Sequence, residues 1–193
     1  MRLRFSRISW MQGLAVTAIV LAQASIAAAL PTPGEKAVRA RVTDPDGRVL
    51  DLRFPHEKPI LILYEGKTSE KQNQVLKDEL ERLSRQEKES RKAIRFAAVA
   101  DVAKYDYWPV RGLAERTIRQ RAAETGSAIY CDWDGRFRSA FGIDATRSTV
   151  LFIGADGRVQ FAAEGPLRAD ARERLIEMLR EAAGSTKLAN NKG

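Results

Sequence analysis

The chain is organised around an apolar run at residues 60–63, which leads through Tyr64 into a short polar turn and then into a segment with helical spacing. A strand covered on both faces has no polar alternation. We therefore predict that residues 60–64 form the central strand of a sheet. In open α/β sheets the carboxyl end of such a strand is where ligands usually bind.

A helix is predicted directly after this strand. Ser69 and Gln72 have the spacing of a capping box, in which two side chains bond the free N–H groups of a helix start. Thr68 is expected to share the capping role with Ser69. The apolar residues that follow fall on one helical face: Val75, Leu76, Leu80 and Leu83.

A second strand and a second helix follow. Residues 94–100 are almost continuously apolar, which predicts another strand buried on both faces. Residues 110–125 then predict a helix that Gly126 ends. The inner face of this helix is expected to carry Val110, Leu113, Thr117 and Ile118.

The flanking segments complete an alternating α/β pattern. Residues 38–54 predict a hairpin, because period-two alternation surrounds an Asp-Pro-Asp-Gly turn at residues 44–47. The remaining elements are a short strand at 128–131, a short helix holding Phe137 and Phe141, a strand pair at 149–153 and 158–163, and a last helix at 168–183. A polar tail, expected to be frayed, covers residues 184–193.

The amino terminus has the order of an export signal. Arg2, Arg4 and Arg7 precede an apolar stretch at residues 8–29 that ends in small residues, with an A-x-A-like cleavage site at 27–29. The stretch also approaches the ~20 residues of a membrane-spanning helix, so an uncleaved anchor is the alternative. Both alternatives place the domain outside the cytoplasm, in the periplasm or secreted, behind a linker at residues 30–37.

Composition limits the possible chemistry. The net charge is +8, and +8 less the three arginines of the signal leaves +5, with basic and acidic residues mixed rather than clustered. This argues against nucleic-acid binding. One cysteine, Cys131, excludes an internal disulfide and thiolate metal clusters, and one histidine, His56, excludes a multi-histidine metal site. We expect no metal and no cofactor, and we expect His56 to be a solvated loop residue.

Two segments carry a resemblance to a known fold. Residues 131–143, CDWDGRFRSAFGI, contain a D-x-x-G, a short helix and a Gly-Ile, and residues 148–159, STVLFIGADGRV, form a D-G hairpin. With the order of elements, both segments resemble the thioredoxin-like superfamily in its peroxiredoxin and TlpA-like form. The resemblance implies a three-layer sandwich with a mixed sheet over residues 38–183, extended by the amino-terminal hairpin. The Gly-Lys-Thr-Ser turn at residues 66–69 most resembles the YtfJ-type periplasmic proteins.

The resemblance also implies which chemistry is missing. Thr68 and Lys71 stand where the two thiols of a CxxC motif would lie, and Ser148 stands where the family has a cis-proline. A threonine and a lysine cannot exchange disulfides, because that reaction needs a thiolate. A cis bond before serine costs about 3 kcal/mol, so the bond before Ser148 is expected to be trans. Thiol–disulfide exchange is therefore not predicted.

The leading hypothesis is a non-catalytic binding or accessory module for an unknown protein, peptide or small ligand. Residues 64–68, 101–108 and 146–148 are all expected at one edge of the sheet. The candidate binding residues at that edge are Tyr64, Glu65, Lys67, Thr68, Tyr105, Tyr107, Trp108 and Ser148.

Two alternatives remain from the sequence. The first is a one-cysteine, peroxidase-like redox enzyme that uses Cys131. Against it, Cys131 is expected to be half-buried, and a neighbouring carboxylate such as Asp132 raises a thiol pKa. The second is a membrane-tethered accessory module, which requires that residues 8–29 are retained.

Overall fold

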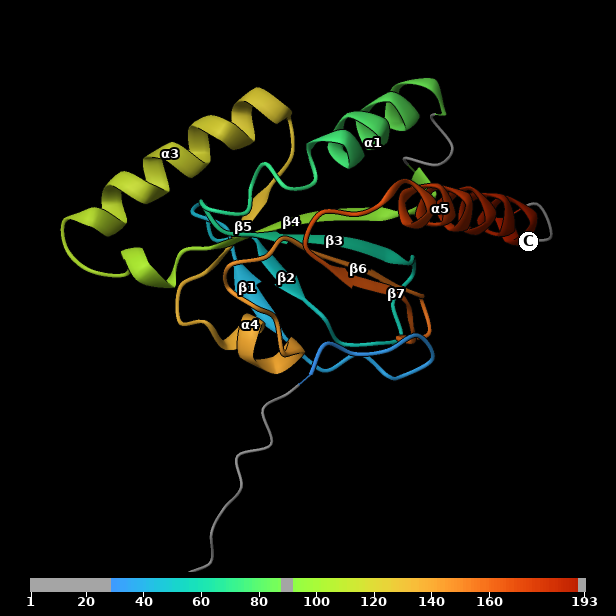
Figure 1. Cartoon of the computed structure of the whole chain (residues 1–193), viewed down its shortest axis with the longest axis horizontal. Helices are drawn as coiled ribbons and strands as arrows, with labels where there is room; N and C mark the ends of the chain where they lie inside the picture. The colour runs from blue at the N-terminus through green and yellow to red at the C-terminus, as the bar shows by residue number, and fades with distance from the viewer. Residues whose placement is uncertain (1–28, 88–91, 191–193) are drawn as a thin grey trace, which may run out of the picture.

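A computed structural model describes residues 29–87 and 92–190 of the protein, in which seven strands form one mixed sheet (Figure 1). The predicted export segment at residues 1–29 lies almost wholly outside the described part. The strand order is β2-β1-β5-β4-β3-β6-β7. The strands are β1 (Arg41–Thr43), β2 (Val49–Asp51), β3 (Ile60–Glu65), β4 (Arg95–Asp101), β5 (Ile129–Asp132), β6 (Thr149–Ile153) and β7 (Val159–Glu164).

The central strand is β3, as predicted. It pairs with β4 in parallel and with β6 in antiparallel register, and β5 continues the parallel part beyond β4. The carboxyl ends of β3 and β4 therefore meet the amino end of β6 at one edge of the sheet. The expected meeting of these three strand ends, at residues 65, 101 and 149, is confirmed.

Helices cover both faces of the sheet (Figure 1). The helices α1 (Gln74–Gln86), α3 (Val110–Thr125) and α5 (Ala169–Asn190) lie on one face, and α4 (Arg136–Phe141) lies on the other with the amino-terminal segment. A 3₁₀ turn, η1 (Ala103–Tyr105), joins β4 to α3. Among the described residues, no helix is both long and apolar enough to cross a bilayer.

Side-chain alternation along β3 builds two separate cores. Leu61 packs with residues of α1 and α5, and the partly buried Leu63 lies at the border of that core. Ile60 and Ile62 are fully buried on the opposite face with Phe137 and other residues of α4. The apolar run is therefore divided between the two faces, because successive side chains of a strand point to opposite sides; the predicted cover on both faces of this strand is confirmed.

Two glycines are required by the backbone. Gly142 ends α4 with a φ of 62°, in the left-handed region that side chains disfavour. Gly157 has a φ of 84° in the turn between β6 and β7, and a Cβ there would lie 2.6 Å from the Cβ of Phe54. The Asp-Gly turn of the predicted hairpin thus also permits close packing of the segment before β3.

The start of α1 differs from the sequence prediction. The helix begins at Gln74, and residues 66–73 form successive turns instead. The Oγ of Ser69 accepts a hydrogen bond from the N–H of Gly66 at 2.9 Å. This bond stabilises the turn at residues 66–69, and Ser69 does not cap α1. Thr68 is exposed and caps nothing, so both capping predictions are wrong.

Four further predictions of burial or extent are corrected. On α3 the expected inward residue Leu113 is 59% exposed, and on β4 Phe96 is 40% exposed, so the shared face of these two elements is incompletely covered. Helix α5 continues to Asn190 instead of ending near residue 183. The expected linker is docked along β7, because the N–H of Gly34 donates to Val159 and the N–H of Val159 donates to Glu35.

Candidate functional site

The incomplete cover leaves a groove between α1 and α3, above β3 and β4, with a volume of about 380 Å³. This volume lies within the 300–1,000 Å³ typical of small-molecule sites. Figure 1 shows α3 standing apart from α1 on the same side of the sheet. We refer to this cavity as the α1–α3 groove.

The body of the α1–α3 groove is apolar. Leu63, Ala98 and Ala100 form its floor, and Val110 and Leu113 form part of the wall on α3. The two alanines are short side chains at positions of β4 that face α3, so the helix has little to pack against there. On α3 only Ile118 is buried. The groove therefore arises because β4 presents small side chains where a close-packed core would need large ones.

Charged residues gather where the α1–α3 groove meets the turn after β3. The Nζ of Lys77 lies 3.0 Å from a carboxylate oxygen of Glu65. Burial raises the pKa of Glu65, while the positive charge of Lys77 acts in the opposite direction. Arg121 of α3 forms an ion pair at 2.8 Å with Glu70 across the groove. Lys67 also lines the groove, and no described residue forms an ion pair with it.

The Glu65 carboxylate is held by a buried network behind the groove. The Ser148 hydroxyl donates to Glu65 at 3.0 Å and accepts from the Asn73 side chain at 3.0 Å. The same Asn73 amide donates to the carbonyl of Gly165 at 2.9 Å and accepts from the N–H of Leu167 at 2.8 Å. Asn73 is only 2% exposed, so its amide satisfies three polar groups that water cannot reach.

A second buried network lies on the other face of the sheet. The Tyr64 hydroxyl donates to Asp132 at 2.9 Å, and the Tyr64 ring stacks on Phe137. Asp132 also accepts from the backbone N–H groups of Phe137 and Arg138, which fixes the first turn of α4. Burial raises the pKa of the Tyr64 hydroxyl, and the charge of Asp132 adds to the effect. On the same face, Arg138 forms an ion pair with Asp101, with an N–O distance of 2.7 Å.

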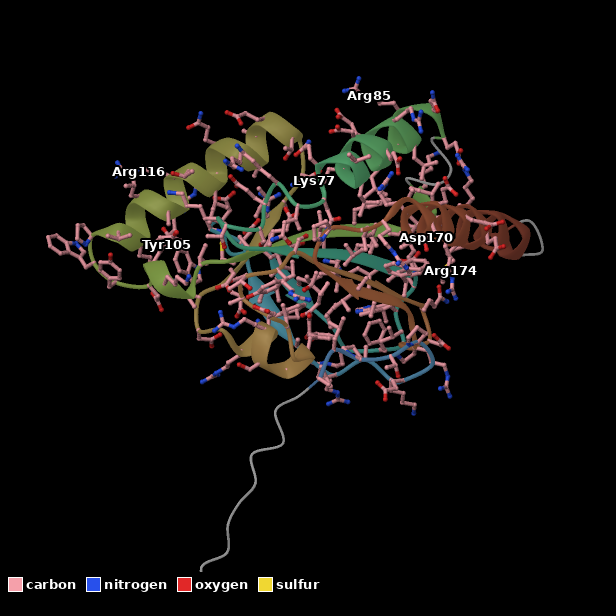
Figure 2. The ribbon with its side chains drawn as sticks, in the orientation of Figure 1. Lys77, Arg85, Tyr105, Arg116, Asp170 and Arg174 are labelled. Atoms are coloured by element: carbon pink, nitrogen blue, oxygen red, sulfur yellow. The ribbon has the colours of Figure 1, made fainter. Side chains whose placement is uncertain are left out.

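Three of the predicted binding residues line the α1–α3 groove: Glu65, Lys67 and Tyr105. Figure 2 shows Tyr105 below the amino end of α3 and Lys77 at the end of α1 nearest to α3. Tyr105 packs against the small cluster around Ile118, so it covers the sheet end as well as lining the groove.

The other five predicted residues lie elsewhere. Tyr64 and Ser148 are buried and hydrogen-bonded internally, so neither presents a free polar group to a ligand. Thr68, Tyr107 and Trp108 are exposed and contribute nothing to the groove lining. Of the three aromatic residues predicted to bind a ligand beyond the end of β4, Tyr105 alone lines the groove. The peptide bond before Ser148 is trans, as expected.

The single thiol is enclosed under α3. Cys131 is 3% exposed and packs with Val102 and Ile118, rather than being half-buried. Burial raises the pKa of Cys131 to about 12, and the negative charges of Asp44 and Glu115 add to the rise. Only the thiolate is a good nucleophile, so burial and the raised pKa both disfavour reaction of Cys131 at neutral pH.

The polar residues that organise the site were not predicted from the sequence. Asn73, Lys77 and Arg138 sit in ordinary polar or helical stretches, and their partners are distant in the chain. The role of Asp132 was not predicted either, but it opens the D-x-x-G segment and its carboxylate accepts from the N–H groups of the short helix that follows. A carboxylate just before a glycine turn and a short helix is a recognisable N-terminal signal.

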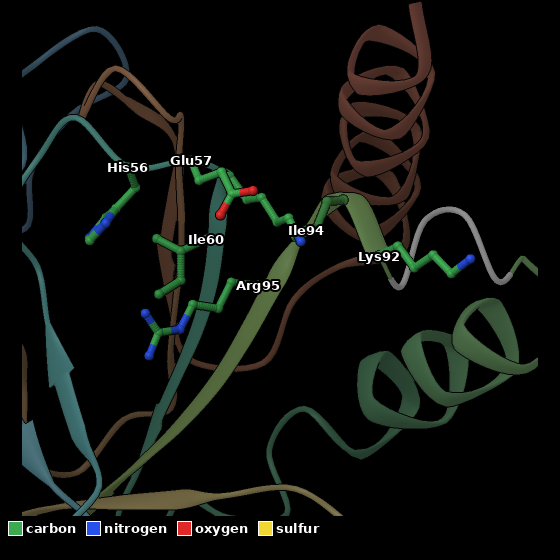
Figure 3. Close-up of a pocket in the computed structure, with 7 residues that line it drawn as sticks. His56, Glu57, Ile60, Lys92, Ile94 and Arg95 are labelled. Atoms are coloured by element: carbon green, nitrogen blue, oxygen red, sulfur yellow. The ribbon is translucent and has the colours of Figure 1, made fainter. Parts of the chain in front are cut away.

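A second cavity of about 440 Å³ lies at the opposite edge of the sheet (Figure 3). Its side chains do not converge, since His56 and Lys92 point away from each other. His56 is half-buried, and its ring packs edge-on against the ring of Phe54, with 4.8 Å between the ring centroids. Its Nε2 atom is buried and has no hydrogen-bond partner among the described residues. The prediction of a solvated His56 is therefore wrong. Within the described residues no cluster of three metal-ligating side chains occurs.

No protein-family model matches the sequence, and a search of curated proteins finds no similar sequence. Solved structures are similar at low identity. A thiol peroxidase from Chromobacterium violaceum has a TM-score of 0.55 and 14% identity, covering 79% of this chain and 88% of that chain. A peroxiredoxin-like protein from Aquifex aeolicus has a TM-score of 0.56 and 12% identity, with coverage of 79% and 88%. A thiol-disulfide oxidoreductase from Bacteroides fragilis has a TM-score of 0.55 and 15% identity, with coverage of 75% and 99%.

These likenesses show the fold alone. The protein has an α/β thioredoxin-like fold of the peroxiredoxin and TlpA-like form, with a mixed seven-stranded sheet that includes the amino-terminal hairpin. It has one cysteine, which is buried, and therefore no CxxC pair.

Proposed function

We propose that this thioredoxin-like protein is a binding module without thiol catalysis, and that the α1–α3 groove holds a small ligand with an apolar body and an anionic group. The observation that carries the proposal is the groove itself. It combines an apolar floor of Leu63, Ala98 and Ala100 with a charged end at Glu65 and Lys67. Apolar cavities with a few convergent polar groups are the usual form of a ligand site.

The charge of the lining supports an anionic ligand group. Glu65 is paired with Lys77, and Glu70 is paired with Arg121. The lining residue Asp101 is paired from the far side of the sheet by Arg138. Lys67 is the lining cation for which the described residues supply no counter-charge. An anionic group on the ligand would supply it.

The one-cysteine redox alternative gains no support from the surroundings of Cys131. Its pKa of about 12 and its 3% exposure leave almost no accessible thiolate at neutral pH. We expect no turnover in an insulin-reduction assay. Turnover that disappeared in Cys131→Ser would favour the redox enzyme over the binding module.

The groove is tested with 1-anilinonaphthalene-8-sulfonate, a fluorescent probe with an apolar body and a sulfonate. Leu113→Asp puts a charge into the apolar wall, so we expect binding to weaken roughly tenfold. Val75→Asp is the matched control, because Val75 is 55% exposed on α1 and lies outside the groove. Lys67→Glu should also weaken binding.

Circular dichroism and thermal melts check that each variant is folded before its titration is interpreted. Equal probe affinity in Leu113→Asp and Val75→Asp would place the probe elsewhere and remove the support for a ligand groove. Equal probe affinity in wild type and Lys67→Glu would show that Lys67 does not bind the anionic group of the ligand. The proposal of an apolar ligand groove would still stand.

Export and kinship with the YtfJ-type periplasmic proteins are part of the same proposal. The basic, apolar and small-residue order of residues 2–29 supports export, and the turn at residues 66–69 supports the kinship. Mass spectrometry of the exported protein tests the first part. We expect a mature chain that begins between residues 28 and 30, and retention of Arg2 would indicate an anchor instead.

A further inference from the structure

The turn that leads into α3 exposes large aromatic side chains. Trp108 is 90% exposed and Tyr107 is 58% exposed, which are extreme values for residues that normally bury most of their surface. We call residues 107 and 108 the aromatic turn. Leu113, in the first turn of the helix that follows, is 59% exposed. In Figure 1 the chain between η1 and α3 is the outermost part of the molecule at the left.

The charge around the aromatic turn is positive. The guanidinium of Arg111 forms ion pairs with both acidic neighbours of the turn, with N–O distances of 2.6 Å to Asp106 and 3.2 Å to Glu115. Lys104 and Arg116 are exposed, and neither has an ion pair within the part of the chain that the structure describes. Figure 2 shows Arg116 on the side of α3 away from the sheet.

We propose that the aromatic turn docks this protein onto the surface of an anionic lipid bilayer, with Trp108 and Tyr107 inserted at the headgroup level. Tryptophan and tyrosine prefer this interface because their rings are apolar and their N–H or O–H group stays hydrated. Lys104 and Arg116 flank the turn and are attracted to acidic headgroups. This surface is separate from the α1–α3 groove, whose lining excludes both aromatic residues.

The shape of the aromatic turn favours a bilayer over a protein partner. The two aromatic side chains together offer on the order of 300–400 Å². Each partner in a stable protein interface contributes about 800 Å² of complementary surface. A protruding turn cannot supply that area against a rigid partner, whereas lipid headgroups rearrange around two inserted rings.

The test places a reporter at the aromatic turn of the full chain. Trp10→Phe with Trp133→Phe leaves Trp108 as the single tryptophan. With vesicles of phosphatidylcholine and phosphatidylglycerol, we expect a blue shift of its emission and at least a twofold loss of intensity when the acyl chains are brominated. Unchanged emission overturns the proposal, even if residues 8–29 carry the chain to the vesicles, because Trp108 would then remain in water.

Two controls separate a specific surface from general attraction. Lys104→Glu with Arg116→Glu should reduce the blue shift on these vesicles at least fivefold at equal lipid. Arg136→Glu with Arg168→Glu makes the same change of charge at side chains that are 88% and 85% exposed in other parts of the molecule, and should have little effect. Equal losses in both double variants would overturn the proposal. If Trp108 escapes quenching in the single-tryptophan protein, and Trp108→Ala in the otherwise unchanged chain alters the oligomeric state, the turn is a protein interface instead.

Discussion

Asn73 joins three parts of the chain that are far apart in sequence. Its amide bonds the side chain of Ser148, the carbonyl of Gly165 and the N–H of Leu167. Thr68, five residues earlier, is exposed and makes no hydrogen bond among the described residues. At the scale of single residues, position in the folded molecule therefore separates two polar side chains that look alike in the sequence.

Asn73→Ala should lower the free energy of unfolding by about 2–4 kcal/mol, because it leaves buried backbone groups without partners at about 1–3 kcal/mol each. Thr68→Ala should change it by less than about 0.5 kcal/mol, as a surface substitution without a cap to lose. Urea denaturation of both variants measures the difference. A larger effect at Thr68 would mean that the turn before α1 is wrongly described.

The Cys131 thiol should make stability depend on alkaline pH. Its pKa rises from an ordinary 9.0 to about 12 in the folded protein. Between these values the folded state keeps a proton that the unfolded state loses, so the free energy of unfolding falls by about 1.4 kcal/mol per pH unit. The contribution is fully present below pH 9 and is lost as pH approaches 12.

Urea denaturation of wild type and Cys131→Ala between pH 8 and 10.5 isolates this effect, since the other titrating groups are common to both proteins. The stability of wild type relative to the variant should decline above pH 9. Parallel pH profiles would show that the thiol is ionised more easily than its burial implies.

At the scale of elements, α3 is the least buried helix for its length. Of its sixteen residues only Ile118 is buried. Ion pairs from Arg119 to Asp46 and from Arg121 to Glu70 hold its carboxyl-terminal half, but such exposed pairs contribute little. A helix with few buried apolar contacts opens more readily than the strands beneath it.

Hydrogen exchange should therefore be faster in α3 than in β3 and β6 by roughly tenfold or more. Ile118→Ala should accelerate exchange in α3 while leaving β3 unchanged, because that side chain is the main apolar contact of the helix. Mass spectrometry or NMR reports exchange segment by segment. Protection of α3 equal to that of β3 would show that the groove is closed by packing that its exposed residues do not reveal.

At the scale of the whole molecule, stability comes from two cores divided by the sheet. Leu61 is 2% exposed within one of them, and Leu63, two residues on, is only partly buried where the α1–α3 groove opens. On this face of β3, Leu61 therefore belongs to the core, and Leu63 lines the candidate site.

Leu61→Ala should cost about 2–5 kcal/mol, the usual range for a buried leucine. Leu63→Ala should cost less, because part of its surface already faces the open groove. Thermal and urea denaturation of the pair test this ranking, with circular dichroism as the readout. A Leu63 variant less stable than the Leu61 variant would contradict the open groove.

Much of the element order follows from local pattern. The apolar run of β3, the span of α3 at residues 110–125 and β6 at residues 149–153 are all as predicted. The predictions that failed concern capping and burial, which depend on contacts with other segments of the chain. The cap at Thr68 and Ser69, the inward Leu113 and the solvated His56 each depend on which segment lies opposite, and local sequence does not contain that information.

The alternating α/β pattern, the central strand and the absence of a CxxC pair could be predicted before the structure, because periodicity and residue identity are local properties, and the resemblance of two segments supplied the thioredoxin-like form. The edge at which the segments after β3 and β4 meet the residues before β6 also followed from the order of elements. The enclosure of Cys131, the bonds from Asn73 to Ser148 and to residues 165–167, and the separation of α3 from β4 could not be predicted and were found in the folded molecule. Burial, pKa and cavities depend on contacts between residues distant in sequence, and those contacts exist only once the chain has folded.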